Sequence, residues 1–131
     1  MDVITASQSV VLAEDDDDFR FLLATLLRGD GHPVREFSDG QSLSEYLVSV
    51  SRRGGGPVLV VADVVLPGMT GLAACREART AGCSSPFIFM STFNDETTLL
   101  EAIDLGPTAV FRKPFEVEAL LRVVAEMTTT P

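Results

Sequence analysis

Five short apolar runs, each followed by a segment with helical periodicity, limit most strongly what this chain can fold into. The runs occupy residues 10–13, 33–37, 58–62, 87–90 and 109–112. The segment after each run repeats apolar side chains at intervals of three and four residues, which is the period of one helix face. Strands that alternate with helices form βαβ units with parallel strands. The sequence therefore predicts an α/β fold with five strands and five helices.

Residue spacing also predicts which side of each helix is buried. The expected inward face of the first helix carries Phe19, Leu22, Leu23, Leu26 and Leu27. Asn94 and Asp95 can cap the fourth helix. Its expected inward face carries Leu99, Ala102 and Ile103. Cys75 is expected on the buried side of the third helix, as a small apolar side chain.

Charged residues mark the second and fifth runs as the edges of the sheet. The second run contains Arg35 and Glu36 and begins with Pro33, and the fifth contains Arg112. Charges and an initial proline belong on edge strands, whereas the other runs are continuously apolar, as strands covered on both faces are. The expected fold is therefore a doubly wound, flavodoxin-like three-layer (βα)5 arrangement with a five-stranded parallel sheet of order 2-1-3-4-5.

Length and charge bound the organisation of the chain. Its 131 residues suit one domain, expected at residues 9–127 between an N-terminal extension (1–8) and a tail or linker (128–131). The net charge of −9 argues against a nucleic-acid-binding surface on this domain. No apolar run approaches the length of about 20 residues that spans a membrane, and the first residues do not read as a signal peptide. We therefore expect a cytoplasmic domain without membrane contact.

Polar residues follow four of the five predicted strands. Glu14 and Asp15 follow the first strand, Asp63 the third, Ser91 the fourth and Lys113 the fifth. The first and third strands are neighbours in the expected order, so three carboxylates would crowd one cleft at the carboxyl edge of the sheet. Mg²⁺ relieves such crowding, and a lysine and a hydroxyl suit phosphoryl oxygens. This arrangement favours phosphoryl transfer to a carboxylate.

The loop after the first strand argues against the main alternative ligand for this fold, a flavin. Residues 14–18 read Glu-Asp-Asp-Asp-Asp. A flavin phosphate would need glycine, serine or threonine there, with backbone N–H groups facing the phosphate. Asp16, Asp17 and Asp18 are instead expected to be charges at the start of a helix, where the macrodipole stabilises them.

Four motifs at these strand ends resemble those of one family. They are Glu14-Asp15 with Arg20, Asp63 with Pro67 and Gly71, Ser91, and Lys113-Pro114-Phe115. Together they resemble the receiver domain of two-component response regulators over residues 9–127. The resemblance implies that Asp63 is the phospho-acceptor. It also implies that Asp15, Asp63 and the backbone carbonyl of Val65 bind Mg²⁺ directly, with Glu14 acting through a water molecule.

The resemblance implies further roles and two departures. Lys113 would stabilise the transferring phosphoryl group, and Ser91 would bind it and move, switching the surface of the fourth helix, fifth strand and fifth helix. The Lys113–Pro114 bond is expected to be cis. Val110 stands where the family usually has tyrosine or phenylalanine, and Phe111 should face the other side of its strand. Glu14 stands where aspartate is commoner. Because apolar Val65 and Phe93 flank the path of an attacking water, we hypothesise slow self-dephosphorylation.

Three functions are weighed against these residues. The leading one is a response-regulator receiver that accepts a phosphoryl group from a sensor histidine kinase or histidine phosphotransfer protein. It would be a switch, not an enzyme, catalysing only its own phosphorylation and dephosphorylation, and an effector domain, an output protein or a homodimer would read it. Val110 motivates the alternative, a receiver-like interaction module that works without phosphorylation. A haloacid-dehalogenase-type phosphatase is disfavoured, because its nucleophile follows the first strand and a cap domain needs extra length.

Overall fold

Five strands and five helices alternate along the chain, as predicted. A computed structural model describes residues 9–92 and 96–129. The elements are β1 (Val10–Ala13), α1 (Asp17–Gly29), β2 (Val34–Phe37), α2 (Gly40–Arg52), β3 (Leu59–Asp63), α3 (Gly71–Thr80), β4 (Phe87–Ser91), α4 (Glu96–Asp104), β5 (Thr108–Arg112) and α5 (Val117–Thr128). All strand pairs are parallel and the order is β2-β1-β3-β4-β5. The predicted doubly wound topology is therefore confirmed.

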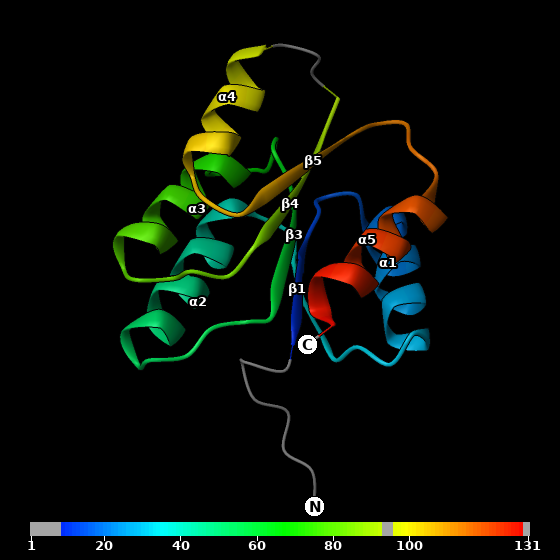
Figure 1. Ribbon diagram of the computed structural model, residues 1–131, viewed down its shortest axis with the longest axis horizontal. Coiled ribbons are helices and arrows are strands. Elements are labelled where there is room, and N and C mark those ends of the chain that lie inside the picture. The colour runs from blue at the N-terminus through cyan, green and yellow to red at the C-terminus, as the bar shows by residue number, and fades with distance from the viewer. Residues whose placement is uncertain (1–8, 93–95, 130–131) are drawn as a thin grey trace, which may run out of the picture.

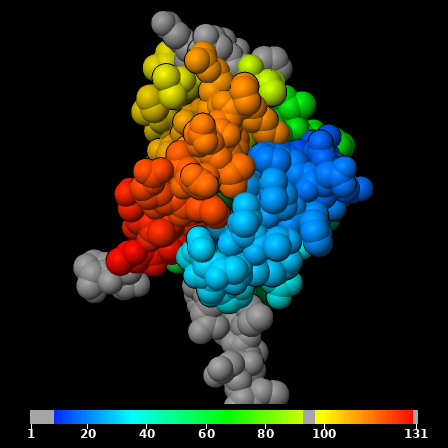
Figure 2. All heavy atoms as spheres, turned by 90° about the vertical axis from the view of Figure 1, so that its right-hand side faces the viewer, coloured from blue at the N-terminus to red at the C-terminus, as the bar shows by residue number. Residues whose placement is uncertain are grey.

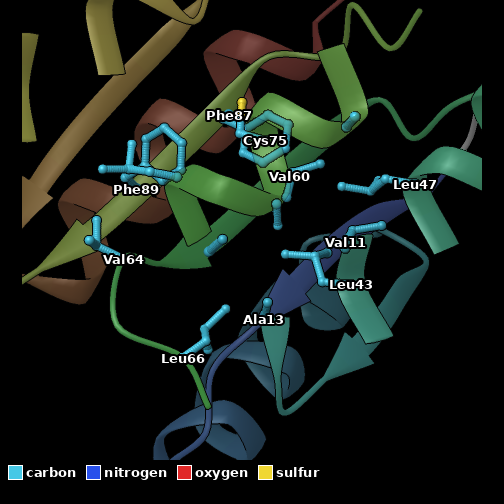
Figure 3. Close-up of a cluster of buried hydrophobic side chains, with 14 of the residues drawn as sticks. Val11, Ala13, Leu43, Leu47, Val60, Val64, Leu66, Cys75, Phe87 and Phe89 are labelled. Atoms are coloured by element: carbon cyan, nitrogen blue, oxygen red, sulfur yellow. The ribbon is translucent and has the colours of Figure 1, made fainter. Parts of the chain in front are cut away.

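The sheet separates two apolar layers. Helices α2, α3 and α4 cover one face, and α1 and α5 cover the other (Figure 1). Because successive strand residues point to opposite faces, Val11 packs with the first group of helices and Leu12 with the second. On the first face, Phe87 and Phe89 of β4 lie in one cluster with Cys75 of α3 (Figure 3). The carboxyl ends of the strands are thus held by cores on both sides.

Side-chain caps fix where three helices begin. Asp16, Asp39 and Thr70 each accept a hydrogen bond from a backbone N–H in the first turn, at 3.0, 2.7 and 3.0 Å. Such caps satisfy N–H groups that have no partner inside the helix. The expected caps of α4, Asn94 and Asp95, lie outside the described residues, as does Phe93.

The buried face of α4 differs from the predicted one. Ala102 is fully buried and Thr98 and Leu105 are partly buried, whereas Leu99 and Ile103 are 47% and 59% exposed. The prediction is confirmed for Ala102 and wrong for Leu99 and Ile103, because it favoured the largest apolar side chains beside that alanine. The helix lies close over β5, where the small Ala102 fits, so it is turned by about 100°, one residue position, from the expected orientation.

A similar correction applies to Leu22 in α1. Leu23, Ala24 and Leu27 are fully buried, but Leu22 is 45% exposed. Phe19 and Leu26 are partly buried, as their places at the margins of the helix face require. Leu27 lies between Leu23 and Ala24 on the buried face, and Leu22, at the margin of the face that spacing predicted, lies outside it.

We expect both cysteines to be unreactive in the folded protein. Cys75 is completely buried and Cys83 is 5% exposed. Burial raises the pKa of the Cys75 thiol to about 11, so the reactive thiolate is scarce at neutral pH. Iodoacetamide at pH 8 should modify neither thiol in the native protein and both in urea, as read by intact-mass analysis. Rapid native labelling of Cys75 would contradict the buried position.

Candidate functional site

The residues predicted to carry the chemistry lie together at the carboxyl edge of the sheet. Glu14 and Asp15 directly follow β1, Asp63 ends β3, Ser91 ends β4 and Lys113 directly follows β5. Glu14, Asp63 and Ser91 are buried, at 1%, 7% and 1% exposed, while Asp15 is exposed. Buried carboxylates require partners, so their environment decides what the site can do.

Lys113 joins the two buried carboxylates. Its Nζ donates hydrogen bonds to Asp63 Oδ2 at 2.6 Å and to Glu14 Oε1 at 2.7 Å. Burial alone lowers the pKa of the Lys113 ammonium, but the hydrogen bonds and charges of Asp63 and Glu14 outweigh burial and raise that pKa above its ordinary value. Lys113 is therefore cationic at neutral pH and links Glu14, which follows β1, to Asp63 at the end of β3.

The three carboxylates of the site carry more negative charge than the single Lys113 ammonium offsets. Glu14, Asp15 and Asp63 each offer a carboxylate oxygen, and these oxygens lie within 4.8 Å of one another. With Lys113 bonded to two of them, the cluster keeps an excess of two negative charges (three minus one). Oxygen donors at this spacing, with one exposed member, fit a hard divalent cation such as Mg²⁺. The predicted metal-ligating carboxylates are thus brought together.

The loop after β3 fixes the orientation of Asp63. The backbone N–H of Val65 donates to Asp63 Oδ1 at 3.0 Å, and the N–H of Gly71 donates to the carbonyl of Val64 at 2.8 Å. A Cβ atom on Gly71 would lie 2.3 Å from the backbone oxygen of Asp63. Glycine at position 71 is required because α3 begins in contact with the backbone that carries Asp63.

We expect Gly71→Ala to destabilise the protein strongly. The added methyl group meets backbone atoms, which cannot move aside as a flexible side chain can, so the loss should be about 2 to 3 kcal/mol in unfolding free energy. Gly29→Ala is the matched control, because a Cβ there meets nothing within 4 Å. That variant should be equal to the wild type or about 0.5 kcal/mol more stable. Urea denaturation measures both, and equal stabilities would refute the close contact at Gly71.

Arg20 holds the backbone of the acidic loop, a role that sequence spacing alone did not assign. Its Nη1 donates to the carbonyl of Glu14 at 2.7 Å, and Nη2 donates to Asp17 at 2.7 Å. Its Nε lies 3.4 Å from Glu36 of β2. The signal for this role was present in the interval of six residues between Glu14 and Arg20, which spans the loop and the first turn of α1.

The three aspartates after Asp15 serve the helix, as predicted. Asp16 caps α1, and Asp17 and Asp18 lie in its first turn. Their negative charges interact favourably with the positive end of the helix dipole, which stabilises the start of α1.

Aromatic rings form the other side of the site. The Lys113 ammonium lies 5.1 Å from the centre of the Phe19 ring, which packs edge-on against Phe115 at 6.1 Å. A pocket of about 440 Å³ opens here, lined by Asp16, Phe19, Thr92, Lys113, Pro114 and Phe115. The sequence assigned Phe19 only to the buried face of α1, and nothing in its spacing pointed to Lys113.

The residues around β5 agree with the expectations for them. Val110 packs with the cluster beneath α2, α3 and α4, and Phe111 packs with the opposite cluster. The peptide bond between Lys113 and Pro114 is cis.

Comparison with protein families matches residues 10–125 to the response regulator receiver domain. The alkaline phosphatase synthesis transcriptional regulatory protein SphR of Synechococcus elongatus is 30% identical over 116 residues, covering 86% of this chain and 45% of that protein. The DNA-binding response regulator MtrA of Mycolicibacterium smegmatis is 30% identical over 117 residues, covering 89% of this chain and 49% of that protein. The chain thus spans about half the length of these curated relatives.

Solved structures share the fold. The receiver domain of the Francisella response regulator 1452 has a TM-score of 0.78 and 21% identity, covering 92% of this chain and 96% of that one. Within the part of the chain that the structure describes, no helix is both long and apolar enough to cross a membrane.

Proposed function

Because this chain belongs to the response regulator receiver family, we propose that Asp63 accepts a phosphoryl group in a Mg²⁺-dependent reaction. The observation that carries the proposal is the pair of hydrogen bonds that Lys113 Nζ donates, to Asp63 Oδ2 at 2.6 Å and to Glu14 Oε1 at 2.7 Å. A carboxylate oriented in this way is a nucleophile that forms an acyl phosphate. The cation beside it offsets the charge that arrives with the phosphoryl group.

The acidic cluster supports a Mg²⁺ site. Asp15 and Asp63 would bind the ion directly together with the backbone carbonyl of Val65, and Glu14 would act through a water molecule. When bound, Mg²⁺ supplies positive charge that neutralises phosphoryl oxygens during transfer. Glu14 already accepts hydrogen bonds from Lys113 and from the backbone N–H of Asp16, at 2.7 and 3.0 Å, which suits contact with the ion through a water molecule.

Ser91 and Lys113 complete the proposed site. Ser91 is buried at the end of β4, and its backbone carbonyl accepts a hydrogen bond from the N–H of Lys113 at 2.7 Å. We propose that both side chains bind the phosphoryl oxygens and that the output surface comprises α4, β5 and α5. The exposed Leu99, Leu100 and Ile103 of α4 give that surface apolar contact area, which suits a protein partner.

The partners belong to the proposal as well. A sensor histidine kinase or a histidine phosphotransfer protein would donate the phosphoryl group, and an effector domain, an output protein or a second copy would read the result. The relatives named as transcriptional or DNA-binding regulators support an effector and a cytoplasmic setting. The domain would act as a switch that turns over no separate substrate. The phosphorylation-independent alternative is not favoured, because every side chain needed for transfer is present.

The chemistry of the product tests the proposal. Sodium borohydride reduces an acyl phosphate on aspartate to homoserine, and peptide mass spectrometry locates that residue. After incubation with acetyl phosphate and Mg²⁺, we expect homoserine at position 63 alone. Homoserine at another aspartate, or phosphate that resists borohydride, would assign the chemistry elsewhere.

The proposed metal site gives a separate prediction for Asp15. Asp15→Asn removes one ligand charge and should weaken Mg²⁺ binding by at least about tenfold. Asp18→Asn changes another exposed carboxylate, in the first turn of α1, and should leave Mg²⁺ affinity unchanged. Titration calorimetry distinguishes them, and equal losses in the two variants would mean that general charge, not ligation, holds the ion.

A further inference from the structure

Asp15, one of the proposed Mg²⁺ ligands, owes its position to the main chain around it. Its side chain is exposed and makes no hydrogen bond or ion pair within residues 9–92 and 96–129. Glu14 and Asp63, by contrast, are both bonded to Lys113. A carboxylate oxygen of Asp15 nevertheless lies within 4.8 Å of the oxygens that those two residues offer. The backbone on either side of Asp15 must therefore direct its carboxylate toward the cluster.

Arg20 fixes the peptide group that leads into Asp15. Its Nη1 donates a hydrogen bond to the carbonyl oxygen of Glu14 at 2.7 Å. That carbonyl and the N–H of Asp15 belong to one planar peptide group, so the bond restricts the direction in which the Asp15 side chain leaves the backbone. The far side of Asp15 is held as well, because the N–H of Asp16 donates to Glu14 Oε2 at 3.0 Å.

Glu36 of the edge strand β2 holds the guanidinium group of Arg20. Glu36 Oε1 lies 3.4 Å from Arg20 Nε, and Glu36 Oε2 lies 3.1 Å from Arg28 Nη2. The arginines belong to α1, which contacts β2, and α1 and the residues that lead into β2 adjoin on the face shown in Figure 2. Asp17 also pairs with Arg20, at 2.7 Å, but its side chain is 84% exposed, and such surface pairs contribute little. Glu36, whose side chain is 33% exposed, is therefore the firmer anchor.

The charge of Arg20 does not assist a Mg²⁺ ion at this site. A fixed cation beside a cation site repels the ion. Arg20 and Arg28 are paired with two carboxylates, those of Asp17 and Glu36, so the group of four has no net charge (two plus and two minus). A contribution of Arg20 to metal binding must therefore come from the hydrogen bond that it donates to the acidic loop.

We propose that Arg20 is a positioning residue for the Mg²⁺ site and that Glu36 acts through it; the inference rests on the proposed function. The bond to the Glu14 carbonyl holds the Asp15 carboxylate where the ion binds, so binding does not have to order the loop. The edge strand β2, which supplies no ligand itself, thereby contributes to metal affinity.

The sign of the change in Mg²⁺ affinity separates positioning from charge. If charge alone mattered, removal of the Arg20 cation would tighten Mg²⁺ binding. We expect Arg20→Met instead to raise the Mg²⁺ dissociation constant about tenfold, as loss of a group that orients metal ligands does. Arg28→Met is the matched control and should keep the wild-type affinity. It removes a cation from the same helix, one that binds Glu36 and the carbonyl of Val34 and not the acidic loop.

A double-mutant cycle tests whether Glu36 acts through Arg20. Glu36→Ala should raise the dissociation constant about threefold in the wild-type background and leave it unchanged in the Arg20→Met background. Titration calorimetry of the full chain measures the number of sites separately from the affinity. Partial unfolding of a variant would therefore lower the number of sites and not the affinity.

Two results would overturn this role of Arg20 while the proposed function stood. One is Mg²⁺ binding by Arg20→Met that is as tight as in the wild type or tighter. The other is an equal loss of affinity from Glu36→Ala in both backgrounds, because independent effects add. A wild-type chain that binds no Mg²⁺ would instead overturn the Mg²⁺-dependent function, and the positioning role with it.

Discussion

Asp63→Asn is expected to abolish phosphoryl uptake from acetyl phosphate while the protein stays folded. The amide has the shape of the carboxylate, so its oxygen can still accept the hydrogen bond from the N–H of Val65, which is 3.0 Å from Asp63 Oδ1. Lys113 keeps its second partner, Glu14, at 2.7 Å. What the variant loses is the anionic oxygen that attacks phosphorus.

Intact-mass analysis measures the uptake, and circular dichroism checks the fold. Asp104→Asn is a suitable control, since Asp104 is an exposed carboxylate at the end of α4, and it should be labelled like the wild type. Full labelling of the Asp63→Asn variant would show that another side chain is the acceptor.

Lys113→Met is expected to impair both stability and phosphorylation. Methionine has a similar length but leaves Glu14 and Asp63, which are 1% and 7% exposed, without their shared ammonium. Removing one partner of a buried ion pair is costly, and since Lys113 itself is partly exposed we expect a loss of about 2 to 3 kcal/mol. Without this cation beside the phosphoryl group, the uptake rate should fall about 100-fold.

The pH dependence of the stability loss follows from the raised pKa of Lys113. Burial lowers that pKa, but the two carboxylates raise it by more than burial lowers it, so the pKa in the folded state lies above its ordinary value of 10.5. A group with a raised folded pKa contributes its full stability below its unfolded pKa and loses it as pH rises through the folded one. The difference between wild type and Lys113→Met should hold at neutral pH and shrink above pH 10.5.

Urea denaturation across pH tests this account, with Lys113→Arg as the matched variant that keeps the charge. Lys113→Arg should retain more stability than Lys113→Met, although its planar group meets the two carboxylates with different geometry. A Lys113→Met variant as stable as the wild type at pH 7 would contradict the account in which the Lys113 ammonium stabilises the buried carboxylates of Glu14 and Asp63.

The topology and the site could be predicted because they depend on features that are local in sequence. Each strand is a short apolar run, and the residues that directly follow the strands need no further folding information to reach the same edge. Asp63 and Lys113 are 50 positions apart, yet the sheet order places both at the same edge, and the long lysine side chain spans the intervening β4 to lie 2.6 Å from Asp63 Oδ2.

The helix faces show where residue spacing is insufficient. In α4, Ala102 was predicted to be buried and is, but whether Leu99 and Ile103 or Thr98 and Leu105 flank it on the buried face depends on how closely the helix approaches β5. That separation is a tertiary property, so hydrophobicity favoured the wrong side. Leu22 of α1 was misplaced because it lies at the margin of the predicted face, where spacing does not decide between burial and exposure, whereas Ala24 beyond the opposite margin is fully buried.

The aromatic side of the site was out of reach for a different reason. Phe19 fits the apolar period of α1, and that period says nothing of the Lys113 ammonium 5.1 Å from its ring. The contact arises only when the start of α1 and the segment after β5 are placed side by side. Arg20 is intermediate, since its interval from Glu14 was recognisable but its hydrogen bond to the Glu14 carbonyl required the folded loop.

The most direct test of the central claim is the mass of the wild-type protein after incubation with acetyl phosphate, with and without Mg²⁺. The acidic cluster carries more negative charge than Lys113 offsets, so the approach of a phosphoryl group should depend on the cation. We predict a gain of one phosphoryl group with Mg²⁺ and none after chelation. Equal uptake in both samples, or no uptake where a known receiver is labelled, would contradict a Mg²⁺-dependent phospho-acceptor at Asp63.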